Sequence, residues 1–156
     1  MRRITLRRIP FLVAGLAAAL LLTGSAFAVQ PGAIPQPVEP GPFTVDGLCA
    51  FPVTLTFSGK GGEVDLPGGR TLFTSPGLFG TFTNADDPSK SVTLNISGTA
   101  ERDASDVTIF QGRSVLATHE GLVLIVGTFR GTHDADHYDI IVSGQGTQTP
   151  VCPMIS

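Results

Sequence analysis

Apolar and polar residues alternate with a period of two along most of the chain after residue 43. The alternation is clearest in Val53–Ser58 and in residues 91–97, where aliphatic or aromatic side chains take turns with threonine, serine or asparagine. Such alternation is typical of a strand with one buried face. Further strands are predicted at Arg70–Thr74 and at residues 63–66, 78–83, 107–110, 114–118, 122–130, 137–143 and 146–151.

Glycine, proline, asparagine and aspartate gather between these segments and mark the turns. The turn signals fall at residues 59–62, 67–69, 75–77, 84–89, 103–106 and 144–146. No window beyond the N-terminal apolar run has the 3.6-residue stripe of an amphipathic helix. The sequence therefore predicts an all-β fold, a single small antiparallel β-barrel or barrel-like sandwich of about 8–10 short strands.

One predicted strand departs from alternation, since residues 122–126 are all apolar and residues 140–142 repeat the pattern. A strand that is apolar on both sides is either central and covered on both faces, or has one face against a ligand or partner. Centrality is the commoner cause. The walls of a ligand cavity inside a barrel would need the same residues.

The first 28 residues have the layout of a secretory signal peptide. Four arginines lie among the first eight residues, an apolar run covers residues 11–22, and the segment ends in Ala26-Phe27-Ala28. The run is shorter than the roughly 20 residues that a membrane-spanning helix needs. We expect cleavage after Ala28 and a secreted, extracellular protein without a membrane span; the pair Arg2-Arg3 leaves the twin-arginine route open.

A proline-rich stretch separates the signal peptide from the predicted strands. Residues 29–42 contain five prolines, a composition typical of an extended spacer. Residues 43–156 then form a single β domain, because a chain of 156 residues has room for one core rather than two.

Removal of the signal peptide makes the protein distinctly acidic. The whole chain has 10 Lys+Arg and 13 Asp+Glu, and four of the basic residues belong to the signal peptide, so the mature chain has 6 against 13 and a formal charge of −7. This charge argues against nucleic acid or anionic lipid as a partner, and it also keeps a protein soluble. We expect a monomer that binds no nucleic acid.

Cys49 and Cys152 are the only cysteines, and they lie near the two ends of the predicted domain. Disulfides persist outside the cell, and a bond here would close a loop of about 100 residues, worth roughly 4–5 kcal/mol. The alternative is a pair of free thiols, because the spacing fits neither a zinc site nor a redox motif. We predict the disulfide, which requires the first and last strands to lie close together.

The densest cluster of polar side chains lies at residues 133–139. Imidazole and carboxylate groups at this density are candidate ligands for a divalent metal ion, and they come from His133, Asp134, Asp136, His137 and Asp139. If a strand begins at His137, then His137 and Asp139 share a face and could converge with Asp134. The alternative is an ordinary polar hairpin turn between residues 122–130 and 137–143. The spacing fails as a calcium loop, because Asp139 and Gln145 stand where glycine and glutamate are required.

Other signatures of catalysis are absent from the sequence. There is no Gly-x-Ser-x-Gly turn, no phosphate-binding loop and no dinucleotide fingerprint. A sugar site would need aromatic platforms, whereas the chain has no Trp and one Tyr. We therefore predict no catalytic residue and no cofactor.

Several short motifs resemble those of small secreted all-β proteins of actinobacteria. The resemblance covers residues 43–152 and rests on Cys49-Ala50-Phe51-Pro52, Gly68-Gly69-Arg70, Thr83-Asn84, Ser89-Lys90-Ser91-Val92, Gly112-Arg113 and Val151-Cys152. It implies export and a β fold, and it implies no activity. The expected function is a secreted, non-catalytic domain that binds a small apolar ligand or a protein partner. An inert component of the cell envelope, or a metal-binding or hydrolytic protein that uses residues 133–139, is the alternative.

Overall fold

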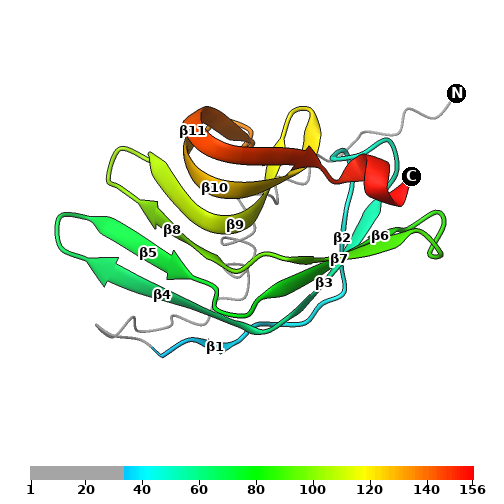
Figure 1. Cartoon of the computed structure of the whole chain (residues 1–156), viewed down its shortest axis with the longest axis horizontal. Coiled ribbons are helices and arrows are strands. Elements are labelled where there is room, and N and C mark those ends of the chain that lie inside the picture. Colours follow the sequence, from blue (N-terminus) through cyan, green and yellow to red (C-terminus); the bar gives the residue numbers. More distant parts are fainter. Residues whose placement is uncertain (1–33) are drawn as a thin grey trace, which may run out of the picture.

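The computed structural model describes residues 34–156, so the predicted signal peptide lies outside the described residues. The described chain is all-β and forms a seven-stranded and a four-stranded antiparallel sheet (Figure 1). The larger sheet contains, in spatial order, β1 (Gln36–Pro37), β4 (Lys60–Leu66), β5 (Arg70–Thr74), β8 (Gly98–Arg102), β9 (Thr108–Thr118), β10 (Gly121–His133) and β11 (Asp139–Pro150). The smaller sheet contains β2 (Phe43–Val45), β3 (Val53–Ser58), β6 (Phe79–Asn84) and β7 (Ser91–Asn95).

The all-β prediction is confirmed, and the predicted barrel is not. Each sheet ends in two free edges, β1 and β11 in one and β2 and β7 in the other, so the sheets do not close into a barrel. The chain ends in a short 3₁₀ helix, η1 (Cys152–Ile155), beside the smaller sheet (Figure 1). Among residues 34–156, no helix has the length and the apolar composition needed to cross a membrane.

The predicted strands agree with the structure where alternation is strong. Val53–Ser58 and Arg70–Thr74 match β3 and β5 at both ends. Two pairs of predicted strands are single long strands, β9 and β11, so Gly112, Gly144 and Gly146 do not make turns. β8 was not predicted, because Gly98–Arg102 contains no large apolar residue. Residues 34–156 form eleven strands in place of the expected 8–10.

Glycine lies inside β11 because the strand approaches its neighbours too closely for a side chain. A Cβ at Gly144 would lie 2.3 Å from the ring of Phe129. Gly146 faces Gly127 across the ladder, both with positive φ, and a Cβ at Gly146 would lie 2.1 Å from the carbonyl oxygen of Val126. These glycines permit two strands to approach each other closely. A prediction that treats glycine only as a turn residue does not detect this role.

The described part of the proline-rich stretch lies along the domain. Gln36 and Pro37 pair with Lys60 and Gly61 of β4. The Phe57 N–H donates to the Pro40 carbonyl at 2.8 Å. Residues 36–40 therefore contact both sheets.

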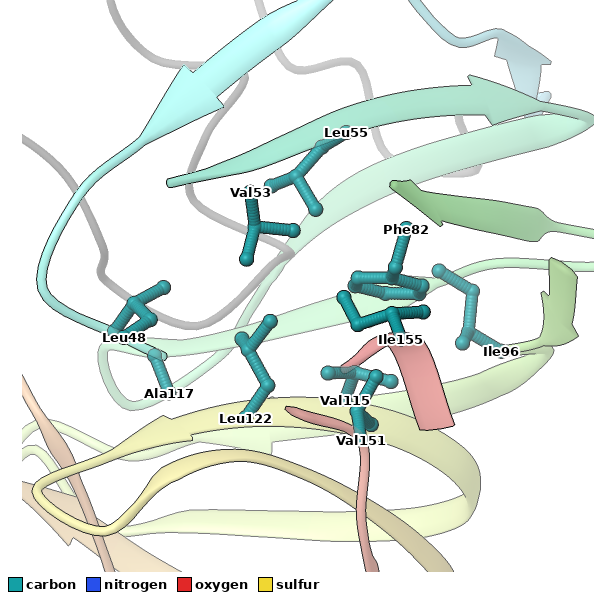
Figure 2. Packing of buried hydrophobic residues seen from close by; sticks show 10 residues of the cluster. All are labelled: Leu48, Val53, Leu55, Phe82, Ile96, Val115, Ala117, Leu122, Val151 and Ile155. Atoms are coloured by element: carbon teal, nitrogen blue, oxygen red, sulfur yellow. The ribbon is translucent and has the colours of Figure 1, made fainter. Parts of the chain in front are cut away.

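The first hydrophobic cluster lies between the two sheets (Figure 2). Its residues come from both sheets and from the C-terminus, and all are buried: Leu48, Val53, Leu55, Phe82, Ile96, Val115, Ala117, Leu122, Val151 and Ile155. The inward positions of β3 and β6 alternate with an outward row of hydroxyls, in which Thr81 bonds Thr93 at 2.8 Å. The alternation of the sequence thus corresponds to one buried and one solvent-facing side of the smaller sheet.

A second cluster lies on the opposite face of the larger sheet, which curls over it. It contains Ala100, Phe110, Leu116, Ile125 and Phe129. β10 contributes to both clusters, because Leu122 and Leu124 pack into the first while Val123 and Ile125 pack into the second. The strand is central, with β9 on one side and β11 on the other, which explains its unbroken apolar run.

The disulfide prediction is confirmed: Cys49 and Cys152 are bonded, with a Cα–Cα distance of 5.6 Å. The bond joins the segment before β3 to the start of η1. Beside it, Ile155 is buried in the first cluster and its carbonyl accepts a hydrogen bond from Asn84 at 3.2 Å. The C-terminus is therefore held by covalent, apolar and polar contacts.

Replacing both cysteines by serine is expected to lower the free energy of unfolding by roughly 4 kcal/mol. The disulfide joins residues 103 apart and restricts the unfolded chain accordingly. Urea unfolding of the double variant measures the change, and wild-type protein unfolded with reductant is the control. Equal stability of the oxidised protein and the double variant would contradict the expectation.

Two Val→Ala substitutions compare the core with the surface. Val115 is fully buried in the first cluster, whereas Val142 is 61% exposed. Val115→Ala is expected to cost roughly 2 kcal/mol or more, because it removes buried methyl groups and leaves a cavity. Val142→Ala is expected to change the free energy of unfolding by less than about 0.5 kcal/mol. Similar costs in urea unfolding would show that the first cluster is not the stabilising core.

Candidate functional site

The predicted polar cluster forms the connection between β10 and β11 and lies against the end of β9. β10 ends at His133 and β11 begins at Asp139, so residues 134–138 are a turn. The expectation that a strand begins at His137 is wrong: this residue has a φ of 67° and lies in the turn. The proposed convergence of His137, Asp139 and Asp134 on one strand face therefore does not arise from the backbone.

Asp134 organises the turn through its carboxylate. Its Oδ1 accepts hydrogen bonds from the N–H groups of Asp136 and Tyr138, each at 2.9 Å. Its Oδ2 makes a short contact with Nε2 of His119, from the β9–β10 turn. The bond from the Tyr138 N–H, and then the bond to His119, lower the pKa of Asp134 below its ordinary value.

His133 lies between two carboxylates. Its Nε2 is 3.1 Å from Oδ1 of Asp139, and its Nδ1 is 3.5 Å from Oδ2 of Asp106 in the β8–β9 turn. The contact with Asp139 raises the pKa of His133 above 6.5; burial opposes this rise, and the charges of Asp139 and Asp106 add to it. The arrangement favours the imidazolium form.

Asp139 is the most buried charged residue in this region, with 4% exposure. Its Oδ2 accepts a hydrogen bond from the Ala117 N–H at 2.9 Å. β8 pairs with β9 only as far as Gly112, so Ala117 has no strand on that side. Oδ1 has no hydrogen bond of standard geometry, and its short approach to His133 is therefore an ionic contact. Asp139 thus supplies the acceptor that a neighbouring strand would supply, and its charge is balanced by His133.

These contacts hold the start of β11 and the turn before it against the end of β9 and the turn after it, although β9 and β11 are not neighbours in the sheet. The rings of His119 and Tyr138 also pack against each other, with centroids 4.4 Å apart and a tilt of 34° between the planes. We call the set formed by His119–Asp134, His119–Tyr138 and Asp139–Ala117 the β9–β11 contact. It fastens the curled end of the larger sheet.

The structure does not bring the five candidate metal ligands together at one point. His133 and Asp139 are brought together, Asp134 is paired with His119, and Asp136 and His137 are exposed in the turn. Within residues 34–156, no three His, Cys, Asp or Glu side chains are grouped so that they could hold a metal ion. The metal site stays a prediction from the sequence.

Two partners of the cluster could not be chosen from the local sequence. Asp106 and His119 come from separate turns: the β9–β10 register, in which Gly131 faces Thr108, brings Asp106 to His133, and the curl of the sheet brings His119 to Asp134. Among the hydrogen bonds of the described residues, no serine, threonine or cysteine side chain bonds a histidine. The contacts that these histidine–carboxylate pairs make fit a structural role in holding the sheet.

Comparisons with protein-family models, with curated proteins and with solved structures find no match. The resemblance to small secreted β proteins of actinobacteria therefore stays an expectation from the sequence.

The stabilising effect of His133 is expected to depend on pH. Because its pKa is raised in the folded protein, its contribution is complete below 6.5 and is lost as the pH rises through the higher folded value. The stability difference between wild type and His133→Asn should therefore be larger at about pH 5.5 than at about pH 8.5. Urea unfolding at each pH measures it.

His137→Asn is the matched control, because it removes an exposed imidazole from the same turn, and asparagine tolerates its positive φ. It is expected to leave the pH profile of the wild type unchanged. A His133→Asn difference that is constant with pH, or that grows toward alkaline pH, would overturn the interpretation of His133 as an imidazolium.

Proposed function

We propose that this protein is a secreted, non-catalytic β domain that binds a protein partner through the outer face of β9, β10 and β11. The outer face is the part of the larger sheet that faces away from the second hydrophobic cluster and lies beyond the residues packed into the first. The observation that carries the proposal is a group of exposed apolar side chains on this face.

Strand register places these side chains near one another. Ile109, Arg130 and Ser143 lie side by side on β9, β10 and β11, and Ile140 follows opposite Thr132. Val142 is the extra residue at the bulge between these pairs. Ile109, Ile140 and Val142 are 41%, 43% and 61% exposed, and Arg130 is exposed among them. Apolar side chains around an arginine are typical of the centre of a protein interface.

A protein partner is favoured over a small apolar ligand. The apolar run of β10 suggested a ligand cavity, but four of its five side chains, those of residues 122–125, pack into the two hydrophobic clusters. The apolar groups left exposed on β9 and β11 lie on a sheet surface, which suits the broad contact of a protein. Arg130 favours a carboxylate on that partner.

Secretion and the absence of catalysis belong to the same proposal. The Cys49–Cys152 disulfide is compatible with an oxidising extracellular compartment. Within residues 133–139, the side chains of His133, Asp134 and Asp139 are occupied with one another, with His119 or with the backbone of β9. They support a role in holding the sheet.

Photo-crosslinking in the native host tests the proposal. The full chain is produced with a photoreactive phenylalanine analogue at Val142, and in a separate control at Phe79, which is 40% exposed on the smaller sheet. We expect the Val142 variant, recovered from the medium, to form a covalent adduct with another protein, identified by mass spectrometry. The Phe79 variant should not form it.

Three results would contradict the proposal. Absence of adducts from Val142 would favour an inert envelope protein, and identical adducts from both positions would indicate unspecific contact. Extra mass of a small molecule in the native spectrum of the wild type, without a protein adduct, would favour the apolar-ligand alternative. An adduct of twice the chain's own mass reports a second copy and does not count as a partner.

A further inference from the structure

β11 is a long edge strand, and no described strand pairs with the edge that points away from β10. It has twelve residues and, among the described strands, pairs only with β10. All residues from 142 to 148 are exposed. An edge of this kind presents a row of backbone N–H and C=O groups to which another strand can bond.

The direction of the hydrogen bonds identifies the groups that face outward. The Val151 N–H donates to the Leu122 carbonyl at 2.8 Å, and the register from this pair to Arg130–Ser143 is continuous. In an antiparallel ladder, alternate residues direct their backbone groups to the neighbour and away from it. The outward groups of β11 are therefore those of Gly144, Gly146 and Gln148.

The other sheet edges carry features that discourage pairing. β1 has two residues, one of them Pro37, and it covers part of β4, whose remaining length contains Glu63 and Asp65. β2 has three residues directly after Pro42, and β7 has five residues directly after Lys90. Short length, proline and charge are the usual protections of an edge. In β11, residues 140–149 have neither charge nor proline, and the bulge at Val142 is the main irregularity.

In place of the monomer that the sequence predicts, we propose that the outer edge of β11 pairs, antiparallel and about a two-fold axis, with the β11 edge of a second copy of this chain. The pairing joins two seven-stranded sheets into one continuous sheet. It is independent of the proposed function, because it uses backbone groups of the edge, whereas the partner would contact side chains of the outer face.

Charge favours a second copy at this edge. Two domains with an excess of acidic residues repel each other over most of their surfaces, but residues 140–150 carry no charge. Antiparallel pairing directs the acidic end of each strand, at Asp136 and Asp139, toward the Pro150 end of the other. No like charges are brought together.

Preorganisation also favours a second copy over a flexible peptide. A disordered segment that adds to the edge must lose conformational entropy of about 1–2 kcal/mol for each ordered residue. A second β11 is already extended, because its inner side is paired with β10. Two identical edges can also pair with each other antiparallel about a two-fold axis, as a contact between the same surface of two subunits requires. Because strand pairing alone buries little apolar area, we expect a weak dimer.

Sedimentation equilibrium over a range of protein concentrations tests the proposal, with protein purified from cells that express the full chain. We expect a monomer–dimer equilibrium for the wild type. Gln148→Lys should weaken dimerisation by about tenfold or more, because each dimer gains two positive charges within one short strand pair.

Gln111→Lys is the matched control, since Gln111 is exposed on the same sheet but lies on the central strand β9. It should dimerise as the wild type does. Gln148→Pro is the second variant, because it removes an outward N–H and leaves the inward hydrogen bonds to β10 intact. It should also be monomeric while its circular dichroism stays that of the wild type.

The proposal is overturned if the wild type is monomeric at all concentrations, if both lysine variants dissociate equally, or if association continues beyond the dimer. Partner adducts at Val142 together with a monomeric wild type would refute the dimer alone. A dimer without partner adducts would refute the proposed function alone.

Discussion

The burial of both faces of β10 is the constraint on which this fold depends. A strand that is apolar at five successive positions needs cover on two sides, and here two different clusters provide it. The smaller sheet and the C-terminal segment cover one face, and the larger sheet curls to cover the other. Each cluster alone would leave one row of β10 side chains in water, at a cost of about 25 cal/mol per Å² of apolar area. The two-sheet arrangement follows from this requirement.

The curl of the larger sheet leaves backbone N–H groups of β9 without a strand partner, and polar residues within 133–139 compensate for this loss. Where β9 continues past the end of β8, its backbone N–H groups lose their strand partner, and one of them lies in the buried interior. Asp139 accepts the hydrogen bond of Ala117, and His133 balances the buried carboxylate. In the sequence, this cluster suggests a metal site. In the structure, it supplies hydrogen bonding that the sheet lacks because the sheet does not close.

The sequence predicts the local parts of this structure well and its long-range parts poorly. Val53–Ser58 and Arg70–Thr74 could be placed because each alternates visibly, and the disulfide because only two cysteines are present. β8 could not be predicted, because the burial of this strand depends on the residues around Ala100 and not on an alternation of apolar and polar residues within the strand. The glycines of β11 suggested a turn, because a close strand approach and a turn demand the same residue. In the candidate site, Asp106 and His119 are separated from residues 133–139 by intervening strands, and no spacing rule connects them.

Backbone groups of the larger sheet are paired within the protein where they are buried, whereas those along the free edge of β11 are left to solvent. Asp139 satisfies one open backbone group of β9 because that group is buried, where an unpaired N–H is costly. The backbone groups of residues 142–148 face water, which satisfies them at no cost, and the fold itself therefore does not require a partner there. Proline lies in β1, charged residues lie in β4, and Lys90 directly precedes β7, all beside equally hydrated groups, so hydration alone does not explain why residues 140–149 of β11 have neither. An edge without these protections, beside the exposed Ile140 and Val142, is what a surface that binds another protein chain requires.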